Sequence, residues 1–237
     1  MRLVVTRPLE DANILAARLT ELGHVVFVEP MLTIEPVPAA DMPRGPWQAI
    51  LLTSSHAARL LKPHGELHHV PVLAVGERTA EVARETGFSA VEAAKGDAIS
   101  LAALVRERLQ PEGGRLLYVT GRDIARDMQA ELRERGFTVE RHIIYKAETS
   151  QSLSAEMRER LRRGEVDGVI LLSPRTAATW RRLVAEAGLG EQLAGLVHYC
   201  LSEAVAAALQ RDHPASLRTV VALQPSMASM MEAIDRT

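Results

Sequence analysis

Short hydroxyl, glycine and arginine residues recur in this sequence directly after apolar runs and directly before stretches with helical spacing. A loop between a parallel strand and a helix offers free backbone N–H groups and the positive end of the helix dipole, which attract anions. Such loops facing one cleft would hold a large anionic molecule, although each taken singly is better explained as an ordinary helix cap. The segments are Thr6-Arg7, Ser54-Ser55, Gly76-Glu77-Arg78-Thr79, Thr120-Gly121-Arg122, Ser173-Pro174-Arg175 and Ser202-Glu203.

No stronger enzyme signature competes with these loops. Glycine-rich phosphate loops of the GxGxxG or Walker type are absent, as are HExxH, CxxC and GxSxG motifs. The histidines His64, His68 and His69 have no accompanying cysteine, so a solvated loop is favoured over a metal site. Cys200 lies in an apolar strand and is expected to be a buried thiol. An enzyme with this sequence would therefore hold a reactive substrate in shape, rather than act through a nucleophile or a cofactor.

The elements that position these loops belong to an internal duplication. Three pairs of segments share a pattern in which an apolar run is followed by a small polar break and a helical stretch. Each unit reads as a strand followed by a helix, which predicts parallel sheets covered by helices. The pairs are residues 3–28 with 117–139, 47–59 with 166–180, and 72–80 with 198–206.

Two long extended segments indicate how the units are shared between domains. Prolines punctuate residues 30–46, and residues 137–148 are β-prone over a length that exceeds one ordinary strand. If these tails pair as a two-stranded connection, the first, fifth and sixth units form one domain and the second, third and fourth form the other. A split into two consecutive halves near Pro111 fits the repeat equally well but leaves both tails unexplained.

The favoured fold is therefore α/β, with two parallel-sheet domains, one inserted in the other and joined by a two-stranded extended connection. The chain of 237 residues is long enough for two small domains, and 47% hydrophobic residues suffice to fill their cores. The expected boundaries are 1–34 with 149–237 for the first domain, 39–143 for the inserted domain, and 35–38 with 144–148 for the connection.

Charge and composition exclude several classes of protein. A net charge of −2 and only 3% aromatic residues argue against nucleic-acid binding, which usually needs a basic face and stacking rings. No run approaches the length of a membrane span, and residues 1–15 lack the pattern of an export signal. We therefore expect a cytoplasmic monomer that binds neither nucleic acid nor membranes.

Several short motifs, in their order and spacing, resemble those of the uroporphyrinogen-III synthase family. The resemblance spans the whole chain, and because each motif is short, its specificity rests on order and spacing. It implies two α/β domains, one inserted in the other and joined by a two-stranded connection. The motifs are Val5-Thr6-Arg7-Pro8, Leu52-Thr53-Ser54, Val75-Gly76 with Thr79-Ala80, Ile144-Tyr145 and Leu172-Ser173-Pro174.

The resemblance also implies a reaction that needs no cofactor. Hydroxymethylbilane, a linear anionic tetrapyrrole, loses its hydroxyl as water to give an azafulvene. Attack at the substituted carbon of the last ring forms a spiro intermediate, which opens and recloses with that ring inverted to give uroporphyrinogen III. This product leads to haem, sirohaem, cobalamin or chlorophyll. The family further implies a transient contact with the deaminase that makes the substrate.

Tyr145 matches the family's cleft tyrosine, so the resemblance makes it the candidate for assisting departure of hydroxide, by donating a hydrogen bond or a proton. A strand residue that packs the connection is an equally good interpretation of the same position. Ser54, Thr79 and Ser173 match positions that line the family's cleft and are assigned to substrate contact. The other expected substrate-binding residues are Thr6, Arg7, Gly76, Gly121, Arg122, Pro174 and Ser202, with Arg175 as a further source of positive charge.

One departure from the family pattern bears on activity. The family's second glycine and threonine of the last unit fall at Ser202 and Val205, so one hydroxyl is missing and another appears three residues earlier. Ser202 is expected to replace the lost contact, and an inactive family member is the alternative. Two other classes fit the architecture: a two-domain protein that binds an anionic small molecule, and a transferase acting on a nucleotide-linked substrate.

Overall fold

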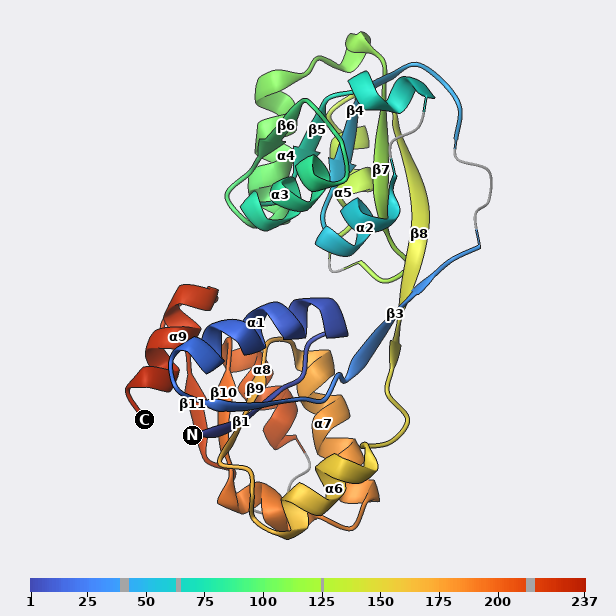
Figure 1. The fold of residues 1–237 in the computed structure, drawn as a ribbon. Helices are drawn as coiled ribbons and strands as arrows, with labels where there is room; N and C mark the ends of the chain where they lie inside the picture. Colours follow the sequence, from blue (N-terminus) through green and yellow to red (C-terminus); the bar gives the residue numbers. More distant parts are fainter. Residues whose placement is uncertain (39–42, 63–64, 125, 212–215) are drawn as a thin grey trace. The chain divides into compact units, whose positions relative to one another are not determined.

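The computed structural model describes residues 1–38, 43–62, 65–124, 126–211 and 216–237. Residue 39, the expected start of the inserted domain, and His64 lie outside these ranges. The chain divides into two compact units (Figure 1). The first unit comprises Met1–Thr33 with Glu148–Thr237, and the second comprises Ile34–Ala147.

The first unit contains a five-stranded sheet in the order β11-β10-β9-β1-β2, in which every pair of neighbouring strands is parallel. Its strands are β1 (Arg2–Val5), β2 (Val25–Val28), β9 (Gly168–Leu171), β10 (Val197–Cys200) and β11 (Thr219–Val221). Its helices are α1 (Leu9–Glu21), α6 (Ala155–Arg162), α7 (Pro174–Glu186), the 3-10 helix η3 (Gly190–Gly195), α8 (Glu203–Gln210) and α9 (Met227–Asp235).

The second unit is built on a six-stranded sheet in the order β3-β8-β7-β4-β5-β6. Neighbouring strands are parallel in the pairs β8-β7, β7-β4, β4-β5 and β5-β6. Its strands are β3 (Leu32–Pro36), β4 (Trp47–Leu52), β5 (Val72–Ala74), β6 (Val91–Ala93), β7 (Arg115–Gly121) and β8 (Val139–Thr149). Its helices are α2 (Ser55–Leu60), α3 (Glu77–Glu85), α4 (Ala98–Arg108) and α5 (Met128–Arg133), with the 3-10 helices η1 (Gly65–His69) and η2 (Pro111–Gly113).

The strand orders display the predicted duplication. The order β2-β1-β9-β10-β11 in the first unit corresponds, strand for strand, to β8-β7-β4-β5-β6 in the second. Strand β7 follows Pro111 in sequence, yet it lies between β8 and β4. A split into two consecutive halves is therefore excluded. The predicted fold class, two parallel-sheet α/β domains with one inserted in the other, is confirmed.

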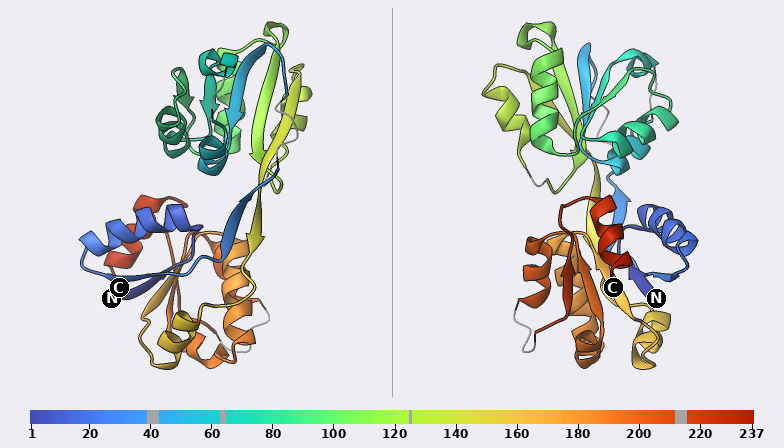
Figure 2. Two further views of the ribbon diagram at one scale, coloured as in Figure 1. Left: turned by 45° about the vertical axis from the view of Figure 1, so that its right-hand side comes forward. Right: turned by 90° about the vertical axis from the view of Figure 1, so that its left-hand side faces the viewer.

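Helices cover both faces of each sheet, as Figure 2 shows. Alternation along the strands produces the two faces: in β1, Val4 packs in the cluster that contains Trp180 of α7, whereas Leu3 and Val5 pack in the cluster that contains Leu15 of α1. All of these side chains are at most 4% exposed. Burying each aliphatic side chain of this kind stabilises the fold by about 1.5 to 3 kcal/mol.

Strand β8 accounts for the long β-prone run of residues 137–148. It spans 11 residues, Val139–Thr149, as one strand that continues past residue 143, the expected end of the inserted domain. Neighbours on both sides explain the length, because β7 lies along one edge of β8 and β3 along the other. Just after β3, the Val37 N–H donates to the Ile144 carbonyl at 3.0 Å, and within β3 Glu35 pairs with Lys146 at 2.8 Å.

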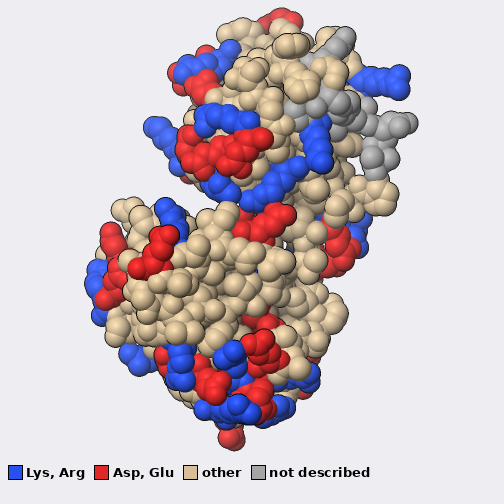
Figure 3. Space-filling model, viewed as in Figure 1, with Lys and Arg blue, Asp and Glu red and all other residues tan. Residues whose placement is uncertain are grey.

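Charged side chains of both signs are intermixed on the face seen in Figure 3, in keeping with the net charge of −2. A basic surface of the kind that binds nucleic acid does not appear on this face. Within the described part of the chain, none of the helices combines the length and the apolar character needed to span a bilayer.

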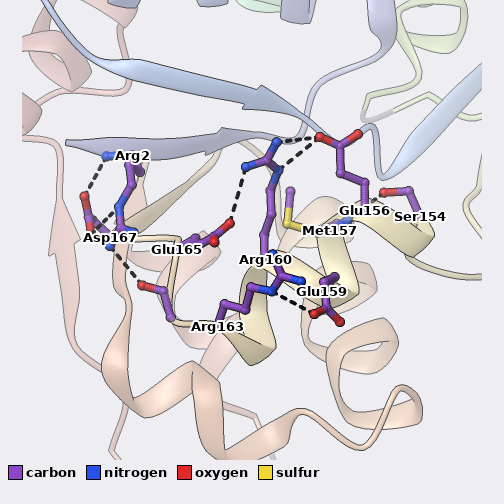
Figure 4. Close-up of polar contacts among 10 residues, drawn as sticks. Arg2, Ser154, Glu156, Met157, Glu159, Arg160, Arg163, Glu165 and Asp167 are labelled. Atoms are coloured by element: carbon purple, nitrogen blue, oxygen red, sulfur yellow. Dashed lines mark hydrogen bonds and ion pairs between the residues drawn. The ribbon is translucent and has the colours of Figure 1, made fainter.

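The amino-terminal edge of the first sheet is held by ion pairs (Figure 4). Arg2 at the start of β1 pairs with Asp167, which precedes β9, at 2.6 Å, and it donates to the Gly164 carbonyl at 2.9 Å. On α6, Arg160 pairs with Glu156 at 2.6 Å and with Glu165 at 3.5 Å. The Arg2 contacts and the Arg160–Glu165 pair join β1 and α6 to the segment before β9, at the edge opposite to the one where the strands end, whereas the Arg160–Glu156 pair lies within α6.

Candidate active site

The loops predicted from the sequence lie at the carboxyl edge of each sheet. In the second unit, α2 begins directly after Ser54 and α3 directly after Gly76. In the first unit, α7 begins after Ser173 and α8 after Ser202. The carboxyl ends of parallel strands meet at one edge, so each unit brings its own loops together. Each edge thus presents several helix N-termini, which favour anions.

Tyr145 is the centre of the candidate site in the second unit. It lies on β8 opposite Gly121, the last residue of β7. Its phenol lies near the Ser54 side chain, whose hydrogen bonding is one influence on the pKa of the phenol. Its ring meets His56 edge-on, with 5.9 Å between the ring centroids and 67° between the planes. The structure therefore brings together three predicted residues, Tyr145, Ser54 and Gly121, from separate segments of the chain.

The surroundings of Tyr145 keep its phenol protonated. Burial is the main influence and raises the pKa of the phenol above its ordinary value of 10.0. The hydrogen bond with Ser54 lowers the pKa in part, and Tyr118 and Asp123 raise it by charge. At neutral pH the phenol therefore carries its proton and can donate a hydrogen bond or that proton to a leaving oxygen.

Gly121 has no side chain, and the Tyr145 ring occupies the space that a side chain at this position would fill. A Cβ atom at position 121 would lie 2.6 Å from Cζ of Tyr145 and 3.0 Å from its phenol oxygen. Both distances are shorter than van der Waals contact allows, so a larger residue would displace the ring. The next residue, Arg122, donates its backbone N–H to the Tyr145 carbonyl at 2.8 Å. The Arg122 side chain is exposed and forms no ion pair with any residue that the structure describes.

At the carboxyl edge of the sheet in the second unit, Gly76 and Thr79 contribute mainly backbone groups. Gly76 is the N-cap of α3 and has an extended backbone, with φ −169° and ψ 173°. Its Cα faces Gly96, where an added Cβ would lie 3.1 Å from the Gly96 Cα, so close backbone approach explains the glycine. Thr79 is 5% exposed, and its N–H donates to the Gly76 carbonyl at 3.1 Å.

In the first unit, the polar groups of Thr6 and Arg7 are already engaged. Thr6 is fully buried, and its hydroxyl donates to the Ile170 carbonyl at 2.6 Å. Arg7 pairs with Asp11, one turn along α1, at 3.0 Å. The Thr6 side chain thus joins β1 to β9, and part of the Arg7 charge is balanced within its own helix.

Ser173 and Pro174 form a typical start of a helix. Pro174 occupies the first turn of α7, where its missing N–H costs nothing. The Ser173 hydroxyl accepts from the Thr176 N–H at 3.1 Å and lies 2.7 Å from the Thr176 hydroxyl. Capping therefore accounts for the Ser173 side chain, and the remaining free N–H groups of the first turn face the carboxyl edge.

Ser202 differs from the other caps. It occupies the N-cap position of α8, yet its side chain makes no capping hydrogen bond. Val205, where the family has threonine, is 1% exposed and packs in the apolar cluster of α7 and α8. The Ser202 hydroxyl is therefore not committed to the helix, whereas Val205 offers no polar contact.

Three residues near Tyr145 were missed by the sequence analysis: His56, Tyr118 and Arg141. His56 lies in the first turn of α2, and its place two residues after Ser54 was a usable signal. The Tyr118 hydroxyl lies 3.4 Å from the Thr53 hydroxyl, a contact between two strands that spacing alone does not reveal. Arg141 donates to the carbonyls of Gly121 and Arg122, and this depends on sheet register that no local pattern encodes.

Metal and thiol chemistry find no support in the described residues. No group of three or more His, Cys, Asp or Glu side chains among them could hold a metal ion. Cys200 is buried, and burial raises the pKa of its thiol to about 12, so the thiol remains protonated. The prediction that Cys200 is a buried thiol is confirmed.

Comparison with known proteins identifies the family. The fold is similar to uroporphyrinogen-III synthetase from Helicobacter pylori 26695, with a TM-score of 0.65, 17% identity and 100% of both chains covered. It is also similar to a mutant uroporphyrinogen III synthase from the extremely thermophilic bacterium Thermus thermophilus, with a TM-score of 0.52, 19% identity and coverage of 100% of this chain and 98% of the other. No curated protein sequence gives a significant match. The family model described as uroporphyrinogen-III synthase HemD matches residues 13–232, nearly the whole sequence. The chain therefore belongs to the uroporphyrinogen-III synthase family, as its motifs predicted, and its role lies in tetrapyrrole biosynthesis.

Proposed function

We propose that this chain converts hydroxymethylbilane into uroporphyrinogen III, with loss of water and inversion of the last pyrrole ring, and that Tyr145 assists the departure of the hydroxyl. Family membership supports the reaction. The observation that carries the role of Tyr145 is its protonated phenol beside Ser54 at the carboxyl edge of a parallel sheet. A carbon–oxygen lyase of this kind needs a donor at the leaving oxygen.

In the proposed reaction, the product keeps every atom of hydroxymethylbilane except those of one water molecule. The carbon–oxygen bond of the hydroxymethyl group breaks as Tyr145 donates a hydrogen bond or its proton to the oxygen. The electron pair of the adjacent pyrrole nitrogen forms the azafulvene double bond. The N–H proton goes to the phenolate if Tyr145 has transferred its proton, or to the departing hydroxide if Tyr145 has donated only a hydrogen bond, so one water leaves in either case. Carbon–carbon bond formation at the substituted carbon gives the spiro intermediate. That intermediate opens and recloses with the ring inverted, without a cofactor.

Binding of the anionic substrate is proposed for the loops of both carboxyl edges. Backbone N–H groups and helix dipoles attract its carboxylates, and exposed guanidinium groups add charge-assisted hydrogen bonds. Thr6 is fully buried, so its part in the site is to hold the loop that carries Arg7. The Ser173 hydroxyl is already bonded, so Ser173 contributes through its backbone, whereas Ser202 offers its hydroxyl. The proposed residues are Ser54, Gly76, Thr79, Gly121 and Arg122 in the second unit, and Thr6, Arg7, Ser173, Pro174, Arg175 and Ser202 in the first.

The remaining expectations about organisation stand as proposals. Domain boundaries at 1–34 with 149–237 and at 39–143, joined by 35–38 and 144–148, are supported by the Val37 to Ile144 hydrogen bond and by the neighbouring positions of β3 and β8. We further propose a cytoplasmic monomer that contacts the preceding deaminase transiently, because unstable hydroxymethylbilane is best transferred without delay.

Isomer analysis of the product tests the function. The protein is incubated with freshly generated hydroxymethylbilane, the products are oxidised, and the uroporphyrin isomers are separated. Spontaneous closure gives the uninverted type I isomer, so an excess of type III establishes both the substrate and the inversion. If folded protein yields only type I, the proposed activity is wrong, and a binding protein or an inactive family member becomes the better account.

A further inference from the structure

Strand β8 contains a bulge immediately before Tyr145. Along β7 and β8, Thr120 pairs with Ile143, but the next residue of β7, Gly121, pairs with Tyr145. One residue of β7 is therefore matched by two residues of β8, and Ile144 is the extra residue. Bulges of this kind redirect the side chains that follow them and are frequent beside active sites.

The bulge decides the face of the sheet on which Tyr145 lies. Val139, earlier on β8, packs in the cluster of Tyr118 on the α4 and α5 side. Strict alternation would place Tyr145, six residues later, on that same side. Instead, both Ile144 and Tyr145 pack against the opposite cluster, which contains Ala57 of α2. Only on this side does the phenol reach Ser54 and the ring meet His56.

Two further features keep the ring in that place. Gly121 provides room, because a Cβ there would overlap the Tyr145 ring. Arg141 fixes the backbone beside the ring: its guanidinium donates to the Gly121 carbonyl at 2.9 Å and to the Arg122 carbonyl at 2.7 Å. The Arg122 N–H in turn donates to the Tyr145 carbonyl at 2.8 Å. The end of β7 is thus bonded to β8 twice, by the Arg141 side chain and by the Tyr145 backbone.

We propose that Gly121 and Arg141 are positioning residues for Tyr145, acting through the bulge at Ile144. Arg141 holds the Gly121-Arg122 backbone against β8. Because Gly121 has no side chain, the Tyr145 ring can lie against its Cα, and the phenol then points to Ser54. This gives Gly121 a role toward Tyr145 in addition to its place at the proposed substrate-binding edge, and it gives Arg141 a role in the site. The kinetic consequence rests on the proposed function of Tyr145, whereas the position of the ring does not.

A titration of the phenol tests the position of the ring without substrate. The chain has three tyrosines, so protein labelled with carbon-13 at tyrosine Cζ gives three signals, and Tyr145→Phe identifies one of them. Gly121→Ala and Arg141→Met should let the ring move toward water. Because burial is the main cause of the raised pKa, the pKa of Tyr145 should fall toward its ordinary value. Arg141→Lys, which keeps a single charged donor, should give an intermediate result.

A double-mutant cycle tests whether the two residues act through Tyr145. Displacing a catalytic group by about 1 Å lowers turnover by about a hundredfold, so Gly121→Ala should lower kcat by roughly that factor with a smaller change in KM. In the Tyr145→Phe background, Gly121→Ala should lower kcat no further, because the group that it displaces is already gone. An independent, multiplicative loss would overturn the proposal.

Matched controls separate positioning from general damage. Gly190→Ala places a Cβ where nothing lies within 4 Å, and Arg133 donates to the Val139 carbonyl at the far end of β8. Gly190→Ala and Arg133→Met should leave kcat and the Tyr145 signal unchanged. If Tyr145→Phe retains full turnover, the proposed function of Tyr145 fails while the titration still tests its position. An unchanged Tyr145 titration in Gly121→Ala and Arg141→Met overturns the positioning proposal itself.

Discussion

At the scale of single residues, accessibility distinguishes Tyr145 from the other tyrosines. Tyr118 is 2% exposed and Tyr199 is fully buried, whereas Tyr145 is only partly buried at the carboxyl end of its sheet. All three positions are described, so Tyr145 is the most exposed of the three tyrosines. Its phenol remains protonated at neutral pH, and the raised pKa favours donation of a hydrogen bond over transfer of the proton.

Replacement of Tyr145 by phenylalanine should separate chemistry from folding. Loss of a general acid typically lowers turnover by two orders of magnitude or more, so we expect kcat of Tyr145→Phe to fall about a hundredfold. KM and the thermal midpoint should change little, because the ring and its packing remain. Steady-state formation of type III isomer is the measurement, with Tyr199→Phe as the control that keeps turnover. Wild-type turnover in Tyr145→Phe would remove this residue from the chemical step.

Ser54 serves both a helix and the candidate site, so its replacement should have two separable effects. The Ser54 hydroxyl accepts from the His56 N–H at 3.1 Å, and loss of such a cap costs about 1 kcal/mol of stability. Its hydrogen bond with Tyr145 lowers the pKa of the phenol, so Ser54→Ala should raise that pKa further. Urea unfolding and the tyrosine titration measure the two effects. Ser226→Ala removes the corresponding cap of α9, at 3.2 Å from the Ser229 N–H, and should reproduce only the first. A fall of the Tyr145 pKa in Ser54→Ala would contradict this account.

At the scale of elements, the ion pair between Arg2 and Asp167 joins the amino ends of β1 and β9. The hydrogen bonds from Arg2 hold the pKa of Asp167 below its ordinary value of 3.8. A carboxylate with a lowered folded-state pKa contributes stability that is fully present above the unfolded value and is lost as the pH falls through the folded value. The pair is partly exposed to solvent, so the contribution is small.

Asp167→Asn should therefore destabilise the protein slightly at neutral pH and less in acid. We expect the difference in unfolding free energy between the wild type and Asp167→Asn to be constant above about pH 4 and to shrink below it. Urea unfolding at a series of pH values measures this difference. Glu156→Gln, on the exposed surface of α6, provides a comparison in which no strand end is involved. A difference that grows as the pH falls would show that the carboxylate is not stabilised by folding.

The same scale explains which features could be read from the sequence. The six strand-helix units were predictable because apolar runs, small polar breaks and helical spacing are local patterns. The bulge at Ile144 was not, because residues 139–149 are β-prone throughout and nothing marks where alternation stops. The hydrogen bond of the Thr6 hydroxyl could not be predicted from the sequence either, since its acceptor is the Ile170 carbonyl of a strand distant in sequence.

At the scale of the whole molecule, duplication gives each unit the same kind of edge, where several helices begin at the ends of parallel strands. The net charge of −2 means that the molecule as a whole does not attract an anion over long distances. Attraction must come from local groups, namely helix N-termini and exposed guanidinium groups such as that of Arg122. Duplication of a βα unit therefore supplies anion-binding positions without requiring a basic protein.

This distribution of charge predicts how catalysis responds to salt. Salt screens exposed charges over about 10 Å at 0.1 M and about 3 Å at 1 M, so KM for hydroxymethylbilane should rise severalfold as salt is increased across that range. Turnover at saturating substrate should change little, because the partly buried Tyr145 phenol is neutral and poorly screened. Initial rates at several salt concentrations measure both quantities, and the thermal midpoint confirms that the fold persists.

Arg122→Gln should raise KM at low salt and make KM less dependent on salt. Arg163→Gln should leave both unchanged, because the Arg163 charge is paired with Glu159 on α6. If KM does not vary with salt, or if Arg122→Gln behaves like Arg163→Gln, then the substrate's carboxylates are bound by buried backbone donors and not by the exposed charge at the end of β7.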